Sequence, residues 1–117
     1  MPGIVFFKTK MLNQIAEFYT KEVGMTIWLT QANCIILRFE NMLVGFCQDD
    51  FGELGGLITF YYDSKEQVNE LYEKFKDIAS EPPRENEKYQ IYNFFAKDPE
   101  GRGIEFQSFL HEVEPIL

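Results

Sequence analysis

The chain has 117 residues, of which 45% are hydrophobic and 16% aromatic, enough for one hydrophobic core. Its 11 basic and 19 acidic residues give a net charge of −8, which disfavours nucleic acid because phosphate contacts need clustered lysine and arginine. No apolar run approaches the roughly 18 residues of a membrane-spanning helix, and the first residues lack the apolar segment of a signal peptide. We therefore expect one soluble, cytoplasmic domain with no nucleic-acid or membrane partner.

Two cysteines, Cys34 and Cys47, lie inside apolar runs. They form neither a CxxC motif nor the spaced framework of a small secreted protein. We interpret them as buried, reduced thiols of a cytoplasmic protein. The sequence leaves open a disulfide between them.

The first half of the chain predicts a strand, a helix and three further strands. Ile4–Thr9 is short, apolar and aromatic, and residues 11–22 repeat apolar side chains at helical spacing. Gly24 can end this helix in a left-handed conformation. The three apolar runs that follow predict an antiparallel meander: Met25–Thr30, Cys34–Phe39 and Met42–Gln48.

The same order restarts after the acidic, glycine-rich stretch at residues 49–56, which we interpret as a linker or flexible loop. Leu57–Tyr62 predicts a strand. Ser64 and Gln67 have the spacing of a capping box at the start of a helix. The apolar stripe of that helix consists of Val68, Leu71, Tyr72, Phe75 and Ile78.

The last third of the chain predicts two strands after a polar segment. Residues 81–88 include two prolines and indicate a loop or a poorly formed edge strand. Tyr89–Ala96 and Gly103–Leu110 predict strands joined by a DPEG turn. A shift of 53 residues places Phe7 on Phe60, which indicates an internal repeat, although any two strand–helix units share part of such a pattern.

Two motifs then point to a family. Phe18–Met25 (FYTKEVGM) resembles the FYxxxLGM signature of the vicinal oxygen chelate superfamily, and Asp98–Phe106 (DPEGRGIEF) resembles its DPDGNxIEF signature. The superfamily includes glyoxalase I, extradiol dioxygenases, fosfomycin-resistance enzymes and bleomycin-binding proteins. The resemblance implies an α+β fold in which two βαβββ modules form a curved mixed sheet with helices outside and a central cavity. It places the modules at about 3–48 and 56–110 of a single domain, and it implies a homodimer, since members commonly dimerise.

The resemblance also identifies the four positions that bind metal in this superfamily. Carried over by spacing, they are Ile4, Val44, Leu57 and Glu105. Only Glu105 could bind a metal, whereas a divalent ion needs three or more nitrogen or oxygen donors at about 2.0 to 2.2 Å. The single histidine, His111, lies beyond the last strand, and we do not expect it to be a ligand. We therefore expect neither a metal nor another cofactor.

Strand alternation gives each sheet one uniformly apolar face and one mixed face. The apolar face must cover the helices. On the superfamily fold the mixed face would line the cavity with Phe6, Lys8, Phe46, Gln48, Thr59, Tyr61, Glu105, Gln107 and Phe109, and Trp28 is a further candidate. Aromatic walls with a few polar groups are typical of small-molecule sites. The alternative is a solvated face whose aromatic residues fill a closed core.

Glu105 has three interpretations because an unpaired buried carboxylate is costly. It could form a structural ion pair with Lys8 or Arg38, contact a cationic or hydroxylated ligand, or act as a general base.

Two functions remain open. The first is a metal-independent small-molecule-binding protein of the glyoxalase/bleomycin-resistance type that holds an aromatic or cationic ligand. The alternative is an enzyme, a relative of the lyases, isomerases or dioxygenases, that uses Glu105 as a general base or in an atypical metal site. The sequence has no P-loop, GxGxxG or G-x-S-x-G motif. It does not identify the ligand or substrate.

Overall fold

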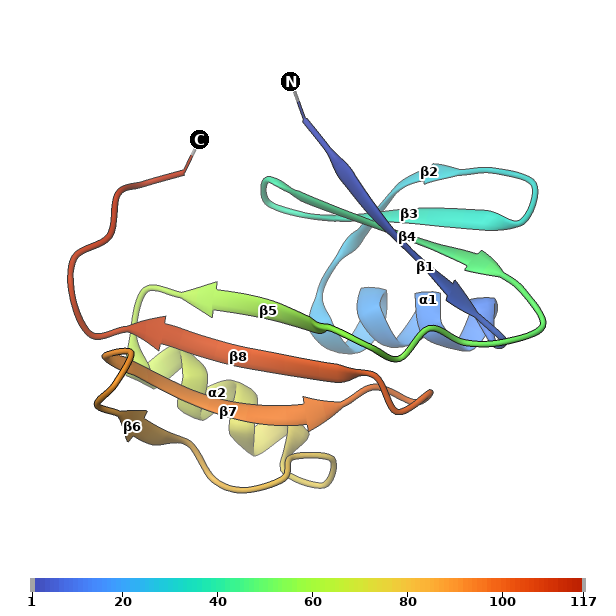
Figure 1. Cartoon of the computed structure of the whole chain (residues 1–117). Coiled ribbons are helices and arrows are strands. Elements are labelled where there is room, and N and C mark those ends of the chain that lie inside the picture. The colour runs from blue at the N-terminus through green and yellow to red at the C-terminus, as the bar shows by residue number, and fades with distance from the viewer. Residues whose placement is uncertain (1, 117) are drawn as a thin grey trace. The chain divides into compact units, whose positions relative to one another are not determined.

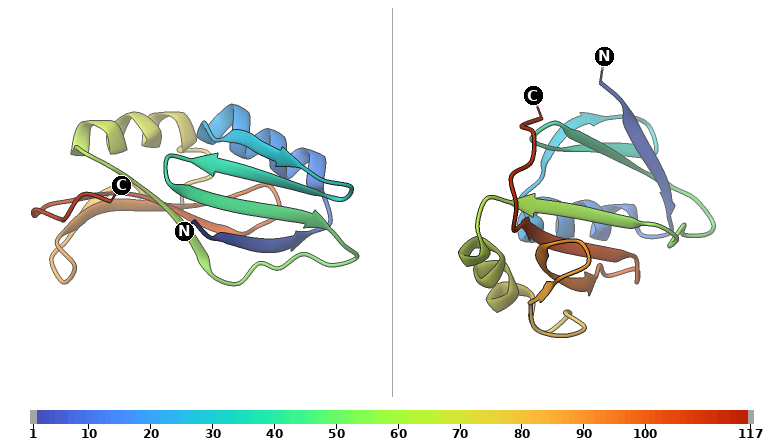
Figure 2. Two further views of the ribbon diagram at one scale, coloured as in Figure 1. Left: turned by 90° about the horizontal axis from the view of Figure 1, so that it is seen from above. Right: turned by 60° about the vertical axis from the view of Figure 1, so that its left-hand side comes forward.

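The computed structural model describes residues 2–116 and has an α+β fold (Figure 1). The chain divides into two compact units, one formed by the residues up to Leu54 and the other by Gly55–Pro115. Each unit has a four-stranded mixed sheet with a helix against one face (Figure 2). The predicted α+β class with two βαβββ modules is therefore confirmed, while the single curved sheet and the central cavity stay predictions. Within residues 2–116, no helix is both long and apolar enough to cross a membrane.

In the first unit, β1 runs parallel to β4, and the other neighbouring strands are antiparallel. The strand order is β1 (Ile4–Thr9), β4 (Met42–Gln48), β3 (Cys34–Phe39) and β2 (Thr26–Thr30). The helix α1 (Leu12–Glu17) continues as a π-helical turn, η1 (Phe18–Val23). It ends at Gly24, whose φ of +100° only glycine adopts without strain, as predicted.

The second unit repeats this arrangement. Its strand order is β5 (Leu57–Tyr62), β8 (Gly103–Phe109), β7 (Ile91–Lys97) and β6 (Arg84–Asn86). The helix α2 (Lys65–Phe75) packs against β5, β7 and β8. The predicted capping box is confirmed, because the Ser64 hydroxyl accepts a hydrogen bond from the Gln67 backbone N–H and the Gln67 side chain accepts one from Ser64 N–H. Of the two alternatives for residues 81–88, the edge strand is present as β6.

Stacked aromatic rings form the layer between each sheet and its helix. In the first unit the Phe46 ring stacks on Tyr19 of η1 at a centroid distance of 5.2 Å. In the second, the Phe106 ring stacks on Phe75 of α2, also at 5.2 Å. Phe7 lies opposite Phe46 as Phe60 lies opposite Phe106, so the repeat in the sequence is a repeat in the structure.

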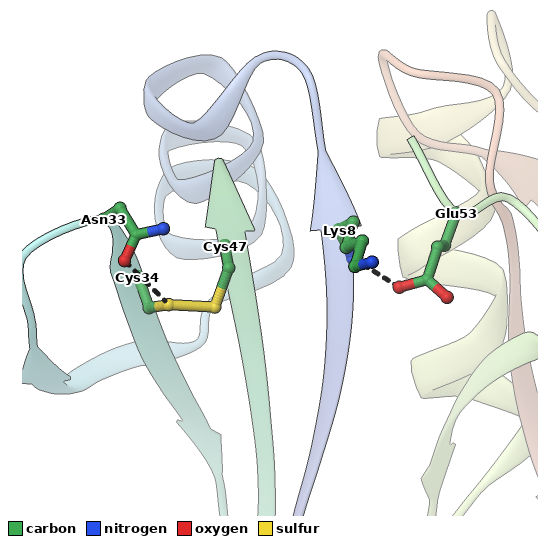
Figure 3. The surroundings of a disulfide bond; sticks show 5 residues. All are labelled: Lys8, Asn33, Cys34, Cys47 and Glu53. Carbon is green, nitrogen blue, oxygen red and sulfur yellow. Dashed lines mark hydrogen bonds between the residues drawn. A yellow bond between two sulfur atoms is a disulfide. The ribbon is translucent and has the colours of Figure 1, made fainter. Parts of the chain in front are cut away.

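The prediction of reduced thiols is wrong: Cys34 and Cys47 form a disulfide (Figure 3). The two residues are separated by 13 positions and are register partners on β3 and β4, with Cα atoms 4.0 Å apart. Both are half-buried. The antiparallel hairpin brings the two apolar runs together, a pairing that the spacing of the cysteines alone does not establish.

Candidate functional site

The carboxylate of Glu105 lies buried on the face of the second sheet that α2 leaves uncovered. The residue is 5% exposed and is held by side chains from two neighbouring strands. Its Oε1 accepts a hydrogen bond of 2.8 Å from the hydroxyl of Thr59 on β5, and its Oε2 accepts one of 2.8 Å from the amide of Asn93 on β7. Both donors are neutral, so the carboxylate is oriented without being neutralised.

The local sequence explains this orientation. Ile104 and Phe106 on β8 are fully buried on the helix side of the sheet, so strand alternation turns Glu105 to the other face. The turn that precedes β8 is closed by Asp98, whose Oδ1 accepts the backbone N–H of Arg102 at 3.0 Å. The buried Arg102 guanidinium donates to Asp98 Oδ2 at 2.7 Å, so this motif fixes where β8 begins.

The charge of Glu105 is not compensated by a salt bridge with any Lys or Arg of residues 55–115. Each carboxylate oxygen accepts one hydrogen bond and keeps a free lone pair. The hydrogen bonds from Thr59 and Asn93 are what offsets the cost of burying this carboxylate. An ion pair with Lys8 or Arg38 would join the two units and stays a prediction.

Aromatic side chains share this face with the carboxylate. Phe95 on β7 is the register partner of Glu105 and is 43% exposed. Tyr61 and Phe109 meet edge to face at a centroid distance of 5.3 Å. Gln107 lies between Tyr61 on β5 and Asn93 on β7. The face therefore combines a buried anion, two neutral amides and exposed rings.

Five of the predicted lining residues are brought together here: Thr59, Tyr61, Glu105, Gln107 and Phe109. The sequence reasoning missed Asn93 and Phe95. The alternation of β7 could have identified them. Asn93 and Phe95 flank the fully buried Phe94, so their side chains must point to the opposite face of the sheet.

In the first unit, Phe6 and Lys8 do lie on the face opposite the helix, since they alternate with Phe7, which stacks on Phe46. The assignment of Phe46 and Gln48 to that face is wrong. Phe46 is 0% exposed beneath the helix. Gln48 accepts the Leu12 backbone N–H at 2.9 Å and donates to the Lys10 carbonyl at 2.7 Å, which ties it to the start of α1.

A one-residue shift between the modules explains this error. Ile4 lies opposite Leu43 as Leu57 lies opposite Gly103, so LVGF in the first unit corresponds to GIEF in the second. The counterpart of Glu105 is consequently Gly45 and not Val44, whose side chain is buried on the helix side.

Trp28 on β2 is 51% exposed. The register between β2 and β3 shifts between Ile27 and Leu29, so Trp28 sits at a bulge. Alternation does not assign a bulged residue to either face.

The residues at the four metal positions do not fit a divalent metal ion. Ile4 and Leu57 are apolar and Gly45 has no side chain, so Glu105 alone of the four could donate to a metal, which needs three or more donors. Within residues 2–116, no three His, Cys, Asp or Glu side chains lie close enough to hold a metal ion. His111 is exposed, and its ring contacts Phe109.

No family model matches the sequence, and no curated protein matches it. Solved structures do match the fold over nearly the whole chain. An integron cassette protein from the mobile metagenome of the Halifax Harbour sewage outfall is 21% identical, with 93% of this chain and 98% of that chain covered and a TM-score of 0.80. A glyoxalase/bleomycin resistance protein/dioxygenase family enzyme from Burkholderia phytofirmans is 18% identical, with 92% and 97% covered and a TM-score of 0.79.

A lactoylglutathione lyase from Agrobacterium tumefaciens is also 18% identical, with 92% of both chains covered and a TM-score of 0.75. These likenesses agree with the fold that the two motifs imply. The chain therefore has the fold of the glyoxalase/bleomycin resistance/dioxygenase proteins of the vicinal oxygen chelate superfamily.

Proposed function

We propose that this is a metal-independent small-molecule-binding protein, and that an aromatic or cationic ligand binds against the Glu105 face of the second unit. The observation that carries the proposal is the buried carboxylate held by two neutral donors, Thr59 and Asn93. An anion in a poorly solvated place attracts a cation more strongly than an anion in water does.

The surrounding side chains suit a flat cation. Phe95, opposite Glu105, and Tyr61 are half exposed, and Phe109 packs against Tyr61, so rings are available on the same face as the carboxylate. A cation over such a ring gains about 0.5 to 2 kcal/mol. Gln107 and Asn93 provide amide groups that can orient polar parts of the ligand.

The proposal includes a homodimer in the cytoplasm. The first unit exposes apolar side chains on its two outer strands, which a second subunit could cover: Ile4, Val5, Phe6, Ile27, Trp28 and Leu29. Sedimentation of the purified protein tests the dimer, and cell fractionation tests the location. A monomer at micromolar concentration would contradict the dimer.

Calorimetry with matched ligand pairs tests the binding site. Benzamidine is a flat aromatic cation, and benzamide is its neutral counterpart of nearly equal size. We expect benzamidine to bind more tightly, and Glu105→Gln to remove about 2 kcal/mol of that binding, or roughly thirtyfold in Kd. Glu87→Gln, which removes an exposed carboxylate of the same unit, is the control and should bind as the wild type does. Equal binding of both compounds would contradict a cation site.

A second candidate is an enzyme in which Glu105 acts as a general base, since a carboxylate without a salt bridge in its unit can accept a proton. Glu105→Gln would then abolish turnover while the protein stays folded. Metal analysis of the purified protein tests the alternative of an enzyme with an atypical metal site. Stoichiometric Ni, Zn, Mn or Fe would overturn metal-independent binding.

Quenching of the fluorescence of the single tryptophan, Trp28, by a bound ligand would indicate that the first unit takes part in binding.

A further inference from the structure

We propose that Cys34 and Cys47 form a thiol–disulfide exchange site whose reaction partner is a small dithiol. The bond lies on the face of the first sheet opposite α1, because Cys47 alternates with Phe46, which stacks beneath the helix. Cys47 has Cys34 as its register partner on one side and Lys8 on the other (Figure 3). The inference concerns the first unit and does not rest on the proposed ligand site at Glu105.

The sheet does not depend on this bond for its pairing. β3 and β4 pair through six register positions, and Cys34 with Cys47 is only the outermost of them. β4 also pairs with β1, and β3 pairs with β2. Because the backbone ladder closes the same hairpin, the sulfur–sulfur bond can open without loss of the strand order.

The disulfide is also more accessible than the residues that are buried beneath α1 on the same strands. Both cysteines are half-buried, whereas Leu37 on β3 and Phe46 on β4 are 0% exposed. Accessible disulfides exchange more readily with thiols than buried ones do. Asn33 Oδ1 lies 3.6 Å from Cys34 Sγ, so an acceptor is already present for the S–H that reduction would create (Figure 3).

A positive charge lies on the neighbouring strand. Lys8 is next to Cys47, and its ammonium is 4.8 Å from the centroid of the Phe51 ring. The carboxylate that accepts the Lys8 backbone N–H, Glu53, lies on the far side of β1 from Cys47 (Figure 3). A nearby cation favours the thiolate over the thiol, and a more stable thiolate leaves faster. The register pairing of Lys8 with Cys47 assigns the role of leaving group to Cys47.

The exchange has two steps. A thiolate of the dithiol attacks Cys34 Sγ, the bond between Cys34 and Cys47 breaks, and its electron pair leaves on Cys47. The second thiolate of the dithiol then attacks the dithiol's own sulfur in the mixed disulfide and releases Cys34 as a thiolate. The two cysteines take up the two protons that the dithiol loses, so the protein disulfide is reduced and the dithiol is oxidised to a cyclic disulfide.

Alkylation under native conditions tests the exchange on the full chain. Iodoacetamide should modify no cysteine before treatment and two after incubation with dithiothreitol, as read by mass, while the near-ultraviolet circular dichroism stays that of the folded protein. Opening of the bond only in denaturant would show a purely structural disulfide and overturn the proposal. Free thiols that do not pair when dithiothreitol is removed and oxidised glutathione is added would overturn it as well.

The rate of reduction tests the leaving group. Lys8→Gln should slow reduction by dithiothreitol at neutral pH severalfold, because the leaving Cys47 thiolate loses the cation on the neighbouring strand. Lys8→Arg should keep the wild-type rate. Lys10→Gln removes an exposed lysine outside the sheet and is the control. Equal rates for Lys8→Gln and Lys10→Gln would overturn the assignment of Cys47 as the leaving group.

Discussion

The ring of Phe6 occupies the space above Gly45, the residue that corresponds in the first unit to Glu105 in the second. A Cβ atom added at Gly45 would lie 2.4 Å from both Cδ1 and Cε1 of that ring. Phe6 lies opposite Gly45 on neighbouring parallel strands, as Thr59 lies opposite Glu105. One unit therefore carries a hydroxyl and a carboxylate at these two positions, and the other carries a ring over a bare backbone.

Gly45→Ala should destabilise the protein because the added methyl group must displace the Phe6 ring. We expect a loss of about 1 kcal/mol in the free energy of unfolding, at the lower end for overpacking, since the half-exposed ring can move outward. Urea unfolding measures it. Phe6→Ala should restore most of the loss in the double variant, and Gly55→Ala, which meets nothing within 4 Å, is the control. Equal losses for the two glycine variants would contradict the contact.

Thr59→Val should destabilise the protein by about 2 kcal/mol, because it removes the hydroxyl that donates to the buried Glu105 carboxylate while keeping the side-chain shape. Thr59→Ser keeps the hydroxyl and should lose much less. Urea unfolding of both variants gives the comparison. A loss for Thr59→Val no larger than that for Thr59→Ser would contradict a stabilising role of the hydrogen bond to Glu105.

Arg102→Met should cost about 3 to 5 kcal/mol, because it leaves the carboxylate of Asp98 buried without its cation. Arg84→Met breaks an exposed ion pair with Glu81 and should cost less than about 1 kcal/mol. Thermal unfolding of both variants measures the difference. A small loss of stability for Arg102→Met would show that the backbone N–H groups that donate to the Asp98 carboxylate suffice to hold the turn.

The ion pair between Lys65 at the start of α2 and Glu85 on β6 should contribute to stability in a pH-dependent way. The hydrogen bond from Lys65 to the Glu85 carboxylate raises the pKa of Lys65. A raised lysine pKa means that the contribution is complete at neutral pH and is lost as the pH rises through that pKa.

Glu85→Gln should therefore lower the midpoint of thermal unfolding slightly at neutral pH, and the difference from the wild type should vanish in strongly alkaline buffer. Both side chains are exposed, so added salt should also reduce the difference. A difference that persists at high pH would point to a role of Glu85 other than the ion pair.

The sequence by itself determined the local elements and their order. Helical spacing, the capping pair Ser64 and Gln67, and Gly24 gave both helices because these signals act within a few residues. The repeat and the two motifs gave the α+β fold. Glu105 could be singled out because a carboxylate between Ile104 and Phe106 conflicts with an apolar strand.

Only the tertiary structure decided what lies next to what across the strands. The partners of Glu105 come from Thr59, which is 46 residues away, and from Asn93 on another strand. The disulfide and the face of Phe46 likewise depend on strand register. A shift of one residue turns every side chain of a strand to the opposite face, and alternation within one strand does not fix its register against the next.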